Sequence, residues 1–162
     1  MGDYYTEQLV KKKPKATDGL IKVGMGIVTI LSIFLIFIIP YAIVITAVLI
    51  FADILLLRRL NVEYEYLYVN GDLDIDKIMS KSKRKKVFEM NIKDMEILAP
   101  SGSSEMRLYQ NIKANNYSSG EEGASAYELI AYKKGEKIKI IFEPNQAILD
   151  GMRMLAPRKI IL

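Results

Sequence analysis

The sequence predicts a membrane α-helical hairpin, followed by a mainly-β (α+β) domain of antiparallel strands that one C-terminal helix closes. Two observations carry this prediction. Residues 20–57 form an almost unbroken apolar run, whereas the chain after it alternates apolar and polar side chains with the period of two that is typical of strands. The 162 residues therefore divide into an N-terminal cytoplasmic segment (1–19), a two-span hairpin (20–57) and a cytoplasmic domain (58–162).

The length of the apolar run favours two membrane spans. A single helix over residues 20–57 would be about 57 Å long at 1.5 Å per residue. The hydrocarbon core of a bilayer is only about 30 Å thick, so two shorter helices fit it better. We expect the break at Pro40-Tyr41, because Pro breaks helices and Tyr suits the membrane interface.

Positive charges flank the run on both sides. Arg58 and Arg59 follow it, and lysines stand before it and at its start, namely Lys11, Lys12, Lys13, Lys15 and Lys22. Loops rich in Lys and Arg stay on the cytoplasmic side. The sequence therefore predicts a multi-pass protein of the cell membrane with both termini in the cytoplasm.

Other interpretations of the N-terminal half fit less well. A cleaved signal peptide has an apolar core of about 7–15 residues and a small-residue cleavage site. A soluble buried hairpin would carry a polar stripe. Neither pattern is present in residues 20–57. The opening MGDYYT matches the myristoylation pattern at Gly2, but a two-span protein needs no acyl anchor.

The apolar run contains two ionisable residues, Lys22 and Asp53. A carboxylate inside a membrane is a candidate functional group that needs a partner. Lys22 lies at the same cytoplasmic end of the first span, so Lys22 and Asp53 are a candidate intramembrane pair. Because Asp53 lies only about 7.5 Å along the helix from Arg58, we favour the alternative that its carboxylate is solvated in the headgroup layer.

The domain opens with a strand, a turn and a second strand. NVEYEYLYV alternates aromatic and acidic residues, and Asn70-Gly71 is the strongest two-residue hairpin signal. The second strand begins with an aspartate at every second position, namely Asp72, Asp74 and Asp76. These carboxylates could be ligands of a cation, or they could form the outer face of the strand. A calcium-binding loop starting at Asp72 would need Gly and Glu where the chain has Lys. The strand interpretation therefore holds, and no metal site is expected.

The remaining elements follow from alternation and from turn residues. Residues 101–126 are rich in Ser, Gly and Asn, which indicates a loop that holds a strand at 106–114 at most. The other expected elements are a long strand with Phe88, Met90 and Ile92 on its apolar face, a hairpin at Lys134-Gly135, and a final helix with Ile148, Met152 and Leu155 on one face.

Taken in order, these segments resemble known proteins. LLLRRLNVEYEYLYVNG, DLDIDKI, KRKKVFEMNIKDMEIL and the FEPN…LDGMRML helix are similar to bacterial pleckstrin-homology-like (PH-like) membrane proteins. The YYTEQLVKKK opening and the APRK tail resemble more closely a family of small bacterial two-span membrane proteins with a PH-like cytoplasmic domain and no assigned activity. The resemblance implies a PH-like antiparallel barrel or sandwich. The polar segment 101–126 departs from that pattern.

A basic cluster is the candidate site of the domain. It consists of Lys81, Lys83, Arg84, Lys85 and Lys86. Near a bilayer such residues attract anionic lipid. They also serve as edge charges that prevent two strands from pairing between molecules. A protein partner is a further alternative, bound by strand addition or in a helix groove.

Composition excludes much chemistry. The chain has no Cys and no His, so thiol nucleophiles, imidazole bases and the zinc sites built from them are excluded. We find no phosphate-binding Gly-rich loop and no nucleophile elbow, and we expect neither catalysis nor a cofactor. The run KSKRKK is also typical of nucleic-acid binding, but the net charge of residues 58–162 is only +3.

The expected function is that of a non-enzymatic integral membrane protein. It presents a binding or scaffold domain at the inner leaflet, where the domain contacts anionic lipid or a protein partner. The alternative is a structural subunit of a larger membrane complex, whose domain only docks a partner protein.

Overall fold

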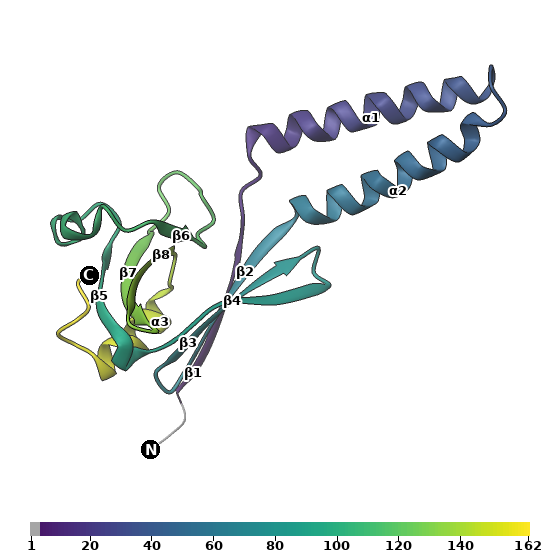
Figure 1. Ribbon diagram of the computed structural model, residues 1–162. Coiled ribbons are helices and arrows are strands. Elements are labelled where there is room, and N and C mark those ends of the chain that lie inside the picture. Colours follow the sequence, from purple (N-terminus) through teal and green to yellow (C-terminus); the bar gives the residue numbers. More distant parts are fainter. Residues whose placement is uncertain (1–3) are drawn as a thin grey trace. The chain divides into compact units, whose positions relative to one another are not determined.

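The computed structural model describes residues 4–162, and Figure 1 shows their helices and strands. Gly2, the residue of the myristoylation pattern, lies outside the described residues. The chain divides into two compact units. One is the helical segment Pro14–Val62, and the other joins the residues before Pro14 to Glu63–Leu162.

The helical unit is a hairpin of α1 (Ala16–Ile36) and α2 (Ala42–Leu60). The chain reverses at residues 37–41, so the predicted break at Pro40 is confirmed. Side-chain hydrogen bonds join the helices. The Thr46 hydroxyl, for example, donates to the carbonyl oxygen of Ser32, at 3.1 Å. The two helices therefore pack in a defined register.

Only one helix of the described residues, α1, is long and apolar enough to cross a membrane. It lies near the N-terminus, and a single helix of this kind is weak support for membrane association. α2 carries three charged residues, Asp53, Arg58 and Arg59, within its 19 residues, whereas the 21 residues of α1 contain two, Asp18 and Lys22. The helical hairpin is thus present, but only one of its helices has the composition of a membrane span, so the two expected spans are not shown.

The first sheet has the strand order β1-β2-β3-β4. Its strands are β1 (Tyr5–Lys11), β2 (Val62–Val69), β3 (Asp72–Met79) and β4 (Lys83–Asn91). The turn at Asn70-Gly71 has positive φ at both residues, 50° and 101°, as predicted for a two-residue hairpin. The side chains of Tyr64, Tyr66 and Tyr68 are buried, which confirms the inner face of this first strand pair.

β1 is a long strand that the sequence analysis missed. We expected residues 1–19 to be a segment apart from the domain, but β1 pairs with β2 antiparallel, from Tyr5 opposite Val69 to Lys11 opposite Glu63. The Gln8 side chain fixes β1 further. Its amide nitrogen donates to the carbonyl of Glu143, at 2.8 Å. The helical hairpin is therefore an insertion between two paired strands.

The second sheet has the order β5-β7-β8-β6. Its strands are β5 (Met95–Pro100), β6 (Ala114–Asn116), β7 (Tyr127–Lys133) and β8 (Glu136–Phe142). Short 3-10 helices, η1 (Ile92–Asp94) and η2 (Ser104–Tyr109), precede β5 and β6 respectively. β6 runs parallel to β8, so this sheet is not purely antiparallel.

Of the two expected architectures, a barrel or a sandwich, the closed barrel is not formed by the described residues. β4 leaves the first sheet through η1, and the eight strands form two separate sheets with unjoined edges. Figure 1 shows the two sheets as distinct layers. The core lies between them, where the rings of Tyr66 and Phe142 pack edge to face with centroids 5.5 Å apart.

α3 (Gln146–Leu155) covers one end of this core. The Asn145 side chain caps it by accepting a hydrogen bond from the backbone N–H of Ile148, at 2.9 Å. Ile148 and Met152 are fully buried, as predicted from their spacing. Leu155 is 53% exposed, so its expected place on the buried face is wrong.

Gly151 provides a test of this packing. An added Cβ would lie 2.3 Å from Cε1 of Tyr4 and 2.8 Å from Cε1 of Tyr68, so both rings would have to move. We expect Gly151→Ala to destabilise the protein by about 1–3 kcal/mol through overpacking. Helix propensity alone favours Ala over Gly by about 1 kcal/mol. The sign of the change in unfolding free energy can be measured by denaturant unfolding of the full chain, monitored by the near-ultraviolet circular dichroism of its tyrosines. A stabilised variant would contradict the packing.

Because β1 and β2 pair directly, the helical hairpin should be removable. We expect replacement of residues 14–61 by a Gly-Ser-Asn-Gly linker to give a folded, water-soluble domain, since short loops join antiparallel neighbours readily. Gel filtration and near-ultraviolet circular dichroism of the purified variant would check this.

The control is a chain that starts at Asn61 and lacks β1. It exposes the β2 edge and loses the contacts of Gln8, so it should aggregate or unfold. Equal stability of the two proteins would show that β1 is dispensable.

Candidate functional site

The basic cluster lies on the β3–β4 hairpin. Its turn places Ser80 and Lys81 at φ values of 49° and 56°, and the N–H of Ser82 donates to the carbonyl of Met79 at 3.2 Å. β4 is an edge strand of the first sheet. The five predicted residues, Lys81, Lys83, Arg84, Lys85 and Lys86, are all exposed.

Two members of the cluster are engaged within the domain. Arg84 pairs with Glu65, at 2.8 Å, and lies 3.8 Å from Asp76. Lys86 pairs with Asp74, at 2.7 Å, and its hydrogen bond to this carboxylate raises the pKa of the ammonium group. Two of the three alternating aspartates are therefore ion-pair partners rather than freely solvated groups.

The other members of the cluster carry unpaired charge. No carboxylate of residues 4–162 lies within 4.0 Å of the ammonium groups of Lys81, Lys83 and Lys85. Lys77, which is directly opposite Lys85 on β3, is likewise without an ion pair in the described chain. We call Lys77, Lys81, Lys83 and Lys85 the basic tip.

The register of the strands fixes where the basic tip lies on the sheet. Lys11 is opposite Glu63, so the chain leaves β1 and returns into β2 at one end of the sheet. β2 reverses into β3 through Asn70-Gly71 at the other end, and β3 then runs back. The basic tip thus lies at the end of the sheet where the chain passes to and from the helical hairpin. Two further lysines, Lys12 and Lys13, follow β1 there.

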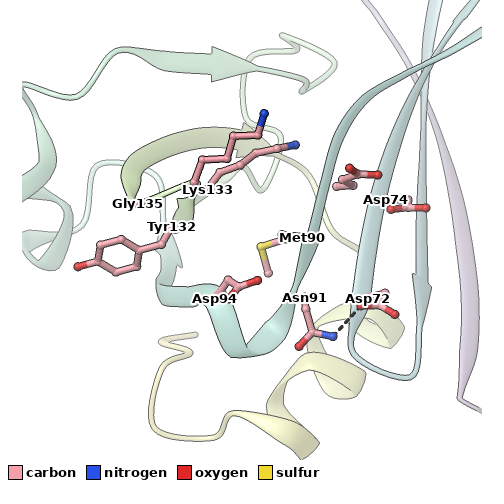
Figure 2. Close-up of a pocket in the computed structure, with 10 residues that line it drawn as sticks. Asp72, Asp74, Met90, Asn91, Asp94, Tyr132, Lys133 and Gly135 are labelled. Atoms are coloured by element: carbon pink, nitrogen blue, oxygen red, sulfur yellow. Dashed lines mark hydrogen bonds between the residues drawn. The ribbon is translucent and has the colours of Figure 1, made fainter.

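A polar cavity of about 570 Å³ lies at the opposite end of β3, next to the β7–β8 turn (Figure 2). Its acidic residues are Asp72, Asp74, Glu89 and Asp94, and its basic residues are Lys133 and Lys134. The Asn91 amide donates to Asp72, at 2.6 Å, as the dashed line in Figure 2 marks. In the described part of the chain, no group of three or more acidic side chains is arranged to hold a metal ion. This cavity is therefore a groove of mixed charge.

A buried ion pair, which the sequence analysis did not single out, lies on the second sheet. Lys139 and Glu128 approach to 2.6 Å, and each side chain is only 9% exposed. Burial raises the pKa of the Glu128 carboxyl, but hydrogen bonds from Lys139 and Ser101 outweigh it and the pKa lies below its usual value. Breaking such a pair leaves an uncompensated buried charge. We regard this pair as structural, because the two charges neutralise each other and the Ser101 hydroxyl donates to the other Glu128 oxygen, at 2.8 Å.

The candidate pair of Lys22 with Asp53 is not formed. Within the helical unit, Asp53 accepts a hydrogen bond from the Thr29 hydroxyl, at 2.5 Å. Lys22 lies seven residues before Thr29 on α1, about 10 Å along the helix axis. The register of the hairpin therefore brings a hydroxyl, and not the ammonium group, to the carboxylate.

Sequence comparison agrees with this architecture. No curated protein and no solved structure matches the chain. The sequence profile of a bacterial PH-like domain family (DUF6106) matches residues 2–162. Because the match covers almost the whole length, the chain belongs to this family of bacterial PH-like domains.

Proposed function

We propose that this protein holds a non-enzymatic PH-like binding domain at the inner leaflet of the bacterial cell membrane, with the basic tip against anionic lipid. The observation that carries the proposal is the strand register. It brings the unpaired lysines of the basic tip to the same end of the sheet as the passage into the apolar hairpin. A basic residue near an anionic surface contributes about 1 kcal/mol to binding.

Two membrane crossings are part of the proposal, with both termini in the cytoplasm. β1 precedes α1 and β2 follows α2, yet the two strands pair along their whole length. A single crossing would place them on opposite sides of the bilayer, so their pairing supports an even number. The charges of α2 are compatible with a second crossing. Asp53 is bonded to Thr29, and Arg58 and Arg59 lie in the last turn, from which long side chains reach the interface.

The alternative function is a structural subunit whose domain docks a protein and ignores lipid. Under that alternative, the lysines of the basic tip protect the exposed edge of β4 from pairing with other strands. The two functions differ in one measurable property, which is the response of the basic tip to the charge of the lipid.

The test uses the full chain, which has no native Cys. A polarity-sensitive dye is attached at Ser82→Cys, in the β3–β4 turn, and the protein is placed in nanodiscs of neutral or anionic phospholipid. We expect a blue shift of the dye emission in anionic lipid only. High salt should abolish the shift, because screening weakens exposed charge pairs.

Substitution should do the same as salt. Lys81→Gln, Lys83→Gln and Lys85→Gln together should abolish the shift. The matched control, Lys113→Gln with Lys133→Gln and Lys134→Gln, removes the same charge from exposed positions elsewhere and should retain it. Equal emission in both lipids would refute lipid contact and favour the docking subunit.

A further inference from the structure

A second exposed surface lies beside the end of α3. A cavity of about 520 Å³ is formed there by η1, the last residue of α3 and the segment after it. Ile92, Leu155 and Pro157 supply its apolar lining. Leu155 is 53% exposed and its neighbour Met154 is 70% exposed, although the rest of the apolar face of α3 is buried. We call this cavity the α3 groove.

Two unpaired cations, Lys93 and Arg158, line the α3 groove. Within residues 4–162, neither side chain has a carboxylate within 4.0 Å. Lys159 is different, because its ammonium group donates to the carbonyls of Lys93, at 3.2 Å, and Met95, at 2.5 Å. The groove therefore combines an apolar floor with a positive rim.

The α3 groove and the basic tip lie at opposite ends of β3. Cδ1 of Leu155 is 3.0 Å from where a Cβ on Gly71 would lie, and Gly71 directly precedes β3. The basic tip ends that strand, about 26 Å away for eight residues at 3.3 Å each. A domain that rests on lipid through the basic tip thus keeps the groove away from the bilayer surface.

From this geometry we propose that the α3 groove docks an acidic segment of another protein. An aliphatic side chain of the segment fills the floor beside Leu155, and its carboxylates pair with Lys93 and Arg158. Charge complementarity and the apolar floor favour this occupant. The position of the groove at the opposite end of β3 from the basic tip favours a protein over lipid as its occupant. The proposal names a partner class for the binding domain and rests on the proposed function only for the orientation of the domain.

The test measures peptide binding to the full chain in nanodiscs of neutral lipid. The probe is a fluorescein-labelled peptide of sequence EDELLEDE, followed by fluorescence anisotropy. We expect saturable binding, weakened about tenfold by Lys93→Gln with Arg158→Gln, since each exposed charge pair contributes up to about 1 kcal/mol. Leu155→Ser should weaken it as well, and a peptide with Ser in place of both leucines should bind less. All these positions are exposed, and unchanged thermal unfolding would confirm folding.

The matched control is Lys133→Gln with Lys134→Gln, which removes two positive charges at the β7–β8 turn and should bind the peptide as the native chain does. Absent binding, or equal weakening by the control, would overturn the proposal. A loss of binding to anionic vesicles in the groove variants would also overturn it, because lipid would then be the occupant. If only the basic-tip variants lose the lipid response and only the groove variants lose peptide binding, lipid contact by the basic tip and peptide docking in the α3 groove are both supported. Peptide binding without any lipid response would refute the proposed function alone.

Discussion

β1 and β2 pair along their whole length, although the entire helical hairpin lies between them in the chain. This pairing fixes both ends of the hairpin at one end of the first sheet. A chain that crossed a bilayer once would leave β1 and β2 on opposite sides, and the sheet would lose its edge strand. Completion of the domain therefore depends on the return of the chain through α2. β1 and β2 can therefore pair only if the helical hairpin brings the chain back to the side of the bilayer from which it started.

The same register organises the charges of the domain. On the outer face, Glu65, Asp74 and Asp76 neutralise Arg84 and Lys86. The lysines of the basic tip are left unpaired at the end that leads to the hairpin, whereas the α3 groove collects its cations beside apolar side chains at the other end. Two positive surfaces thus differ in character. One is a set of lysines on the β3–β4 hairpin, and the other is a concave surface with an apolar floor.

Local chemistry explains which elements the sequence predicted. The turns at Asn70-Gly71 and Lys134-Gly135 contain Gly at a positive φ, and the break at Pro40 follows from its missing N–H. The turn at Ser80-Lys81 was missed, because neither residue favours the left-handed conformation that both adopt.

β1 was missed for a different reason: its inward face is mostly polar, and only pairing with a distant strand makes it part of the sheet. Contacts between residues far apart in the sequence also determine which charged side chains of the candidate site are paired. The basic cluster was found, but its division into paired and unpaired cations depends on the β3–β4 register, and the partner of Asp53 depends on how two helices align.

The most direct test of the account asks whether β1 and β2 are paired while the hairpin spans the membrane. A protease site inserted at residues 37–41 is combined with Leu9→Cys and Glu65→Cys, which are directly opposite each other. A cell-permeable bismaleimide is added to spheroplasts, followed by external protease. We predict cleavage from outside into fragments that stay joined on a denaturing gel only when both cysteines are present. Resistance to external protease, or fragments that separate despite both cysteines, would contradict the account.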